Sequence, residues 1–134
     1  MTETDITQAI IAHIKKLGGD AYHVHGSSMQ RTGEPDIAGW IPDLGGTALH
    51  IEVKTPAGKP TELQAIRLKR YHNSGAFMVG IATSVDDFEM IRKAYNRSVL
   101  ELRGMWGVMQ ELGMQDPYFI YHDKGALDND PIYR

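Results

Sequence analysis

The chain has 134 residues, of which 42% are hydrophobic and 23% are charged. This length and composition are typical of one globular domain, and they exclude a disordered tail protein and a fibrous repeat. The absence of cysteine excludes a disulfide scaffold, a cysteine-based zinc site and a thiol nucleophile. Seventeen acidic residues against 14 basic ones give a net charge of −3, so any contact with a polyanion must come from a local patch.

No membrane partner is predicted. The longest uncharged apolar stretch, 75–85, is far shorter than the roughly 20 residues that a membrane-spanning helix needs. The N-terminus is acidic where a secretory signal peptide would be basic. Both features predict a cytoplasmic protein.

Short elements alternate in the first part of the chain. Four apolar residues from Ile6 to Leu17 recur at spacings of four, four and three, which predicts a helix with a Thr2 or Thr4 cap. Strands are then predicted over 21–25, 36–41 and 47–54. A polar loop, 26–35, separates the first two strands, and turn residues at 42–46 separate the last two.

The second part of the chain starts with a helix signal. Thr61 and Gln64 have the form of a capping box, and Gly75 follows the predicted helix. The apolar run 77–82 predicts a strand covered on both faces, and Ser84 is the expected cap of the next helix. The element order α-β-β-β-α-β-α predicts an α/β fold.

The C-terminal part is less regular. Helical spacing continues over Val99–Leu112, although two glycines within it lower the helix propensity. A last strand is predicted over 118–122. Trp40 and Trp106 are interpreted as core residues rather than as platforms for stacked bases.

The strand predicted over 47–54 carries two alternating sets of side chains, the apolar Leu49, Ile51 and Val53 and the polar His50, Glu52 and Lys54. Side chains two residues apart share one face of a strand. One face is therefore apolar, and the other presents an imidazole, a carboxylate and an ammonium group. Taken alone, this pattern is explained by a half-exposed strand with a solvated outer face.

A second carboxylate changes this interpretation. Pro35 cannot continue a strand backwards, so Asp36 stands at the first position of its strand, where an aspartate is unfavourable for strand formation. A hairpin built on the 42–46 turn brings Asp36 and Glu52 together. Two hard oxygen donors suit Mg²⁺. Lys54, on the face of Glu52, can hold or deprotonate an attacking water and stabilise a pentacovalent phosphate.

The residues described so far resemble the PD-(D/E)xK nuclease superfamily and, within it, the VRR-NUC domain in its small stand-alone phage-type form. The pattern consists of Gly33-x-Pro35-Asp36, Ile51-Glu52-Val53-Lys54 and Gly58-Lys59-x-Thr61-x-x-Gln64. The resemblance covers about residues 3–90, departs from the family at 23–28 and ends near residue 95. It implies a restriction-endonuclease-like α-β-β-β-α-β core, with a mixed central sheet flanked by helices, over 1–95. A C-terminal helical extension, 96–134, would pack on this core or form an interface.

The resemblance also implies the parts of a catalytic site. Asp36, Glu52 and the backbone carbonyl of Val53 would hold Mg²⁺, for which Mn²⁺ would substitute, and Glu3 would approach the metal from the first helix. Lys54 would serve the water or the scissile phosphate, and Gln64 would orient the site. The implied activity is endonucleolytic hydrolysis of DNA that leaves a 5′-phosphate.

Several of these residues have structural explanations as well. Gln64 is equally explained as half of the capping box, and Glu3 as a favourable charge at a helix N-terminus. His23 and His25 share a strand face and could bind metal, but such pairs are more often exposed or packed. His50 is a candidate for a contact with Glu52.

The DNA contacts are expected from the stretch 54–70, which holds five basic residues, Lys54, Lys59, Arg67, Lys69 and Arg70, and one acidic residue, Glu62. Lys59, Arg67 and Arg70 are the predicted phosphate contacts; a solvated helix face is the alternative. Structured or branched DNA is the expected substrate, because a domain this small has little room for base-reading elements. One site per domain and two strands to cut predict a homodimer, with its interface around Val99–Leu112. The competing hypothesis is a non-catalytic nucleic-acid-binding or assembly module with the nuclease fold.

Overall fold

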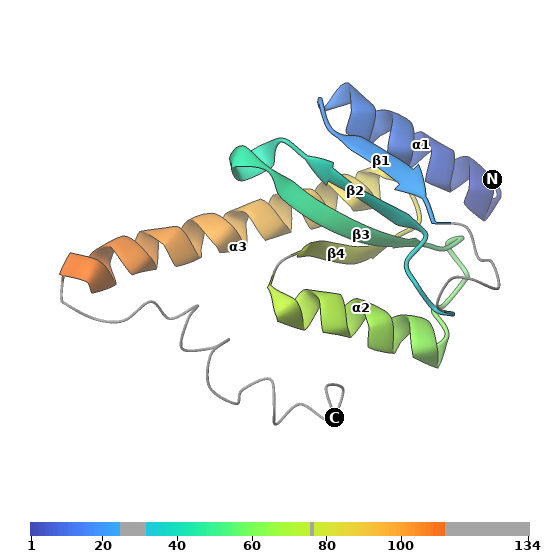
Figure 1. Ribbon diagram of the computed structural model, residues 1–134. Coiled ribbons are helices and arrows are strands. Elements are labelled where there is room, and N and C mark those ends of the chain that lie inside the picture. Colours follow the sequence, from blue (N-terminus) through green and yellow to red (C-terminus); the bar gives the residue numbers. More distant parts are fainter. Residues whose placement is uncertain (25–31, 76, 112–134) are drawn as a thin grey trace. The chain divides into compact units, whose positions relative to one another are not determined.

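A computed structural model of the chain describes residues 1–24, 32–75 and 77–111. Its elements, in chain order (Figure 1), are α1 (Glu3–Lys16), β1 (Asp20–His23), β2 (Ile37–Ile41), the 3₁₀ turn η1 (Asp43–Gly45), β3 (Thr47–Val53), α2 (Glu62–Ser74), β4 (Phe77–Ala82) and α3 (Val85–Glu111). This order confirms the predicted α-β-β-β-α-β core followed by a C-terminal helix. The strand predicted over 118–122 lies outside the described residues.

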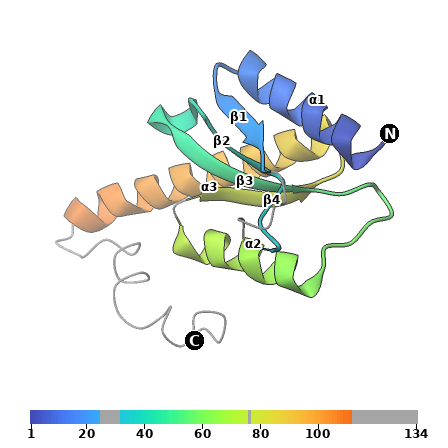
Figure 2. The ribbon, with the colours of Figure 1, turned by 45° about the vertical axis from the view of Figure 1, so that its right-hand side comes forward.

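The four strands form one mixed sheet in the order β1-β2-β3-β4 (Figure 2). β1 pairs with β2 and β2 with β3 in antiparallel orientation, while β3 and β4 are parallel. In the β2–β3 hairpin, Ile37 is the partner of Ile51. Asp36 precedes Ile37 and Glu52 follows Ile51, so this register decides how close their carboxylates lie.

The helix ends follow the capping signals of the sequence. Thr2 caps α1 through a capping box with Asp5, and Thr61 caps α2 through the predicted box with Gln64. α2 ends at Gly75, whose φ of 71° is the left-handed conformation that glycine adopts without strain. The Ser84 hydroxyl accepts a hydrogen bond from the Asp87 N–H at 3.1 Å, as expected of the residue before α3.

The helical spacing predicted from Val99 onwards continues the helix that begins at Val85, and α3 runs without a break to Glu111. Glycine lowers helix propensity but keeps its backbone N–H, whereas proline would remove it, and α3 contains no proline. Leu112 lies outside the described residues.

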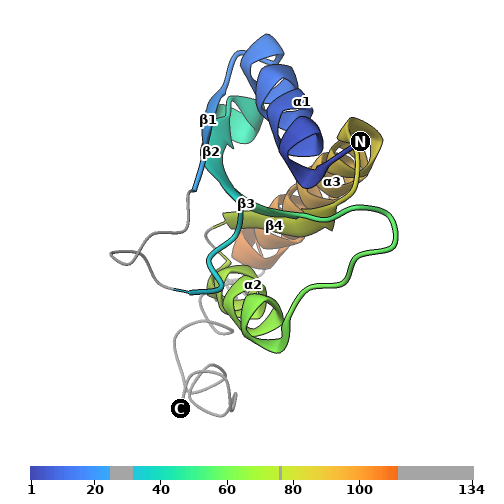
Figure 3. The same ribbon diagram turned by 90° about the vertical axis from the view of Figure 1, so that its right-hand side faces the viewer.

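The core lies on one face of the sheet, beneath α1 and the first turns of α3 (Figure 3). The apolar stripe of α1 supplies the buried Ile6, Ile10 and Ile14. The sheet and α3 supply Ile37, Ile41, Leu49, Ile51, Val53, Met78, Ala82 and Phe88, all fully or almost fully buried. Alternation places the side chains of Glu52 and His50 on the opposite face, against which α2 packs.

α2 covers only part of this second face, and two predictions fail there. Phe77 contacts Tyr71 of α2, but Ile81 at the other end of β4 is exposed, so β4 is not covered on both faces as predicted. Trp40 is also exposed, and its interpretation as a core residue is wrong. The side chain of Trp106 lies outside the part of the chain whose side chains are described. A strand's composition does not reveal how far a helix extends over it.

By its contacts the chain divides into two compact units, and the first, Met1–Arg92, contains the whole sheet. The second begins at Lys93 and includes the rest of α3. Within 1–24, 32–75 and 77–111, no helix is long and apolar enough to cross a membrane.

Candidate active site

The β2–β3 hairpin brings Asp36 and Glu52 together. Asp36 directly precedes β2, and Glu52 directly follows the Ile37–Ile51 pair on β3. The Val53 backbone N–H donates a hydrogen bond of 2.8 Å to Asp36 Oδ2, which holds the aspartate side chain across the strands. The juxtaposition expected from the turn at 42–46 is therefore present in the structure.

Glu52 is the most unusual residue of this pair, because its side chain is 1% exposed. Neither of its carboxylate oxygens has a hydrogen-bond partner in the structure. The Lys54 ammonium nitrogen lies 3.6 Å from Glu52 Oε1, close enough for an ion pair but too far for a good hydrogen bond. A solvated outer face, the simpler explanation of this strand's polar pattern, is thus wrong for Glu52.

Burial raises the pKa of Glu52 to about 8, and the neighbouring Asp36 carboxyl acts in the same direction. The Lys54 ammonium opposes this shift but does not cancel it. A buried carboxylate that accepts no hydrogen bond is costly unless a proton or a cation neutralises it. The pair therefore fits a hard divalent cation, for which carboxylate and carbonyl oxygens are the preferred ligands.

Three of the four predicted metal ligands lie together in the structure. Asp36, Glu52 and the Val53 backbone lie together at this end of the sheet. Glu3 is exposed in the first turn of α1. Among the described residues, no three His, Asp or Glu side chains are grouped closely enough to hold a metal ion. The role of Glu3 stays a prediction, and a cation at the pair would complete its coordination with water.

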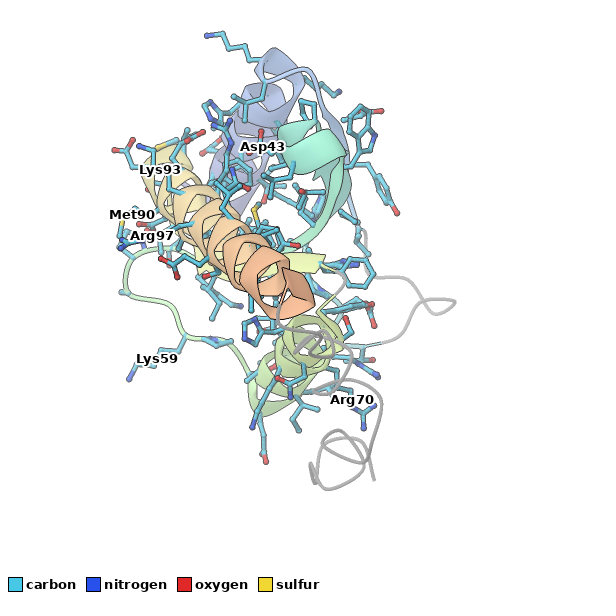
Figure 4. All side chains as sticks on the ribbon, turned by 90° about the vertical axis from the view of Figure 1, so that its left-hand side faces the viewer. Asp43, Lys59, Arg70, Met90, Lys93 and Arg97 are labelled. Atoms are coloured by element: carbon cyan, nitrogen blue, oxygen red, sulfur yellow. The ribbon has the colours of Figure 1, made fainter. Side chains whose placement is uncertain are left out.

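Gln64 and the predicted DNA contacts lie on α2 and the loop before it. The Gln64 side-chain oxygen accepts a hydrogen bond of 2.8 Å from the Thr61 N–H, so its structural role is observed while its catalytic role stays a prediction. Lys59 and Arg70 extend to different sides of α2 in Figure 4. Arg67 instead turns towards the segment before β2, where its Nε donates to the Thr32 carbonyl at 3.3 Å.

His50 lies on β3 and His23 lies on β1, so these two histidines belong to different strands. His50 stacks on Tyr71 with ring centroids 3.9 Å apart, and burial lowers its pKa. Its Nδ1 is buried without a hydrogen-bond partner in the structure. His23 ends β1, while His25 lies outside the described residues. No hydrogen bond joins His50 to the Glu52 carboxylate oxygens.

Sequence reasoning missed two residues beside the site. Glu34 accepts a hydrogen bond of 2.6 Å from the Tyr71 hydroxyl, and these residues are 37 positions apart in the chain. Glu34 stands inside the Gly33-x-Pro35-Asp36 motif at the position that the motif leaves open. The sequence signal for its partner is the stripe of side chains, spaced by four residues, along one face of the helix over 62–74.

Comparison with solved structures identifies the fold. The sequence matches no protein-family model and no curated protein. A structure described as "VRR_NUC domain" is 24% identical, with a TM-score of 0.58, and the match covers 71% of this chain and 99% of the other. A second, described as "VRR_NUC domain protein", is 15% identical, with a TM-score of 0.52, and the match covers 71% of this chain and 88% of the other. The chain therefore has the fold of VRR-NUC domains, which confirms the fold that the resemblance implied.

Proposed function

We propose that the chain is a divalent-metal-dependent endonuclease that hydrolyses phosphodiester bonds of DNA. One observation carries this proposal: the buried carboxylate of Glu52, without a hydrogen-bond partner in the structure, lies beside Asp36. A purely structural role would be served better by a neutral side chain of the same shape, which could not bind a cation. The nuclease-type fold supports the same conclusion.

The proposal assigns a separate task to each residue. Asp36, Glu52 and the Val53 carbonyl hold Mg²⁺, or Mn²⁺ in its place. When bound, the ion supplies a Lewis acid for the scissile phosphate and lowers the pKa of a coordinated water. The Lys54 ammonium, next to Glu52, holds the attacking water or a phosphate oxygen. Gln64 orients the site from the first turn of α2.

The substrate that we propose is structured or branched DNA. Lys59 is exposed on the loop that connects β3 to α2, where it can meet a phosphate without displacing another group. Arg70 is the second proposed phosphate contact. Arg67 is the third, through the guanidinium N–H groups that do not donate to the Thr32 carbonyl. We also propose a homodimer, in which two copies each supply one site for one strand.

The proposed activity can be tested with a panel of labelled DNA. Single-stranded, duplex, flap and four-way DNA are incubated with the protein and Mg²⁺, Mn²⁺ or Ca²⁺. Cleavage is expected with Mg²⁺ and Mn²⁺ and to be strongest on a branched substrate. Glu52→Gln and Asp36→Asn should abolish it, while Asp86→Asn, which neutralises an exposed acid at the start of α3, should not.

The competing class predicts a different result from the same panel. A non-catalytic binding module would shift the DNA in a gel and leave every substrate intact with each metal. Wild-type protein that binds but never cuts would thus replace the endonuclease by the binding module.

A further inference from the structure

Three side chains of α2 recur at intervals of four residues, Leu63, Arg67 and Tyr71, and so form one stripe along the helix. Each of them meets the short segment 32–34, which directly precedes Pro35. Figures 1 and 2 show this segment descending from the start of β2 to α2. The segment ends two residues before Asp36, the predicted metal ligand.

Gly33 makes the closest approach between the segment and the helix. A Cβ atom at this position would lie 2.7 Å from Leu63 Cγ, so any side chain would push the segment off the helix. The φ angle of Gly33 is +83°, which other residues rarely adopt. Both properties indicate that the backbone is held against the start of α2.

Glu34 makes the polar contacts that follow. The Tyr71 hydroxyl donates a hydrogen bond of 2.6 Å to Glu34 Oε2, and Arg67 Nε lies 3.7 Å from Glu34 Oε1. The side chains of Glu34 and Arg67 are each 17% exposed, so water screens this ion pair less than one on the open surface. Tyr71 is itself fixed, because its ring stacks on His50 of β3.

Only Pro35 separates Glu34 from Asp36 in the sequence. Pro35 is fully buried, and its ring restricts the backbone φ angle, so the position of Glu34 is transmitted to Asp36 with little freedom. At the other side, the carboxylate of Asp36 is joined to β3 by the Val53 N–H. Asp36 is thus held between a contact that begins on α2 and a contact on β3.

We propose that Glu34 is a positioning residue, which fixes Asp36 in its metal-binding geometry by tying the segment 32–34 to Tyr71 and Arg67 of α2. The consequence for metal binding rests on the proposed function, whereas the effect on the position of Asp36 does not. The structure contains a direct reporter of that position. The Val53 N–H donates its hydrogen bond to Asp36 Oδ2, so its hydrogen exchange should accelerate when that carboxylate moves away.

The test measures amide hydrogen exchange of the metal-free protein by NMR for Glu34→Ala, Tyr71→Phe and the double variant. Exchange at Val53 should accelerate by about tenfold in each single variant, as expected for the loss of one hydrogen bond. The double variant should be no faster than Glu34→Ala, because both changes break the same contact. Glu34→Gln keeps an oxygen that accepts from Tyr71 and should restore most of the protection. Mn²⁺ affinity, measured by calorimetry, should follow the same order.

Two controls separate positioning from loss of stability. The Ile51 amide lies in the same strand, and its exchange should not change; Glu101→Ala removes a carboxylate paired with Arg97 elsewhere and should leave Val53 protected. Wild-type protection of Val53 in Glu34→Ala, or equal acceleration at Ile51 and Val53, would overturn the proposal. Tyr71→Phe removes a single hydroxyl and provides the decision if Glu34→Ala does not fold. Wild-type protein that binds no Mn²⁺ would refute the proposed function, while the Val53 comparison would still decide the positioning role.

Discussion

The buried carboxylate of Glu52 lowers the stability of the fold, and the same burial suits it to bind a cation. Its carboxylate is buried on the face of the sheet opposite the main core, with Asp36 beside it and without a hydrogen-bond partner in the structure. Such a group favours its protonated form in the absence of a cation, as its raised pKa records. The site is therefore least stable when it is charged and empty.

The raised pKa of Glu52 predicts how the free energy of unfolding of the metal-free protein depends on pH. Between the ordinary pKa of 4.5 and the folded value of about 8, the folded chain retains a proton that the unfolded chain releases. The free energy of unfolding should therefore fall as pH rises through this window, by about 5 kcal/mol in total. Urea unfolding in a chelator at several pH values should show this fall for wild type and a much flatter profile for Glu52→Gln. Parallel profiles would contradict the assigned protonation of Glu52.

Lys54 provides a second prediction at this scale. Lys54→Ala removes the ammonium group beside Glu52 but leaves Asp36, the Val53 carbonyl and the apolar face of β3 in place. Single-turnover cleavage should fall on the order of a hundredfold or more, the effect of losing one preorganised electrostatic group. Affinity for DNA in a gel shift at fixed salt should fall only modestly, because Lys59 and Arg70 remain. Cleavage by Lys54→Ala at the wild-type rate would remove Lys54 from the mechanism.

At the scale of elements, a charged cluster joins α3 to the tip of the β2–β3 hairpin. Arg92 donates to both carboxylate oxygens of Asp43, at 2.6 and 3.1 Å, and also to Glu89 at 3.1 Å. His13 of α1 contacts the same Glu89 carboxylate. The hydrogen bonds to Asp43 raise the pKa of Arg92, so this guanidinium is charged at any accessible pH.

We expect Arg92 to matter more for stability than an arginine in an exposed pair. Arg92→Ala leaves two partly buried carboxylates without their cation and should lower the free energy of unfolding by about 1–3 kcal/mol. Arg97→Ala is the matched control, because Arg97 pairs with Glu101 one turn away while both side chains are largely exposed. Its effect should stay below about 0.5 kcal/mol. Chemical denaturation of both variants measures the difference, and equal losses would show that the Asp43 contact adds nothing.

Local sequence signals predicted most of the helices and strands. They also predicted the Asp36–Glu52 pair but not the contact of Glu34. The caps at Thr2, Thr61 and Ser84 depend on neighbours within four residues, and hairpin register follows from the position of a turn, so both were predictable. The contact of Glu34 with Tyr71 depends on how α2 lies against the sheet, and no local pattern encodes that. The burial of Glu52 was missed for the same reason.

For the molecule as a whole, the net charge of −3 gives no long-range attraction for a polyanion such as DNA. The basic stretch 54–70 is also less available than its composition indicates. Lys54 lies beside Glu52, and Arg67 beside Glu34. Lys59 and Lys69 are exposed and can meet phosphates. A dimer would double these few contacts and supply one site for each strand.

We expect the homodimer to form through the second unit of the chain, which begins at Lys93. In the region Val99–Leu112, Leu100 is 56% exposed, and Leu102 is exposed as well. Sedimentation velocity at micromolar concentration should show a dimer for wild type and a monomer for Leu100→Glu, because a charge in an apolar interface is costly. Met90→Glu is the matched control, since Met90 is an exposed apolar residue of the same helix outside that region (Figure 4). The Leu100→Glu monomer should still nick one strand but lose coordinated cleavage of both. A wild-type monomer that cuts both strands of a branched substrate would show that one copy of the site is sufficient.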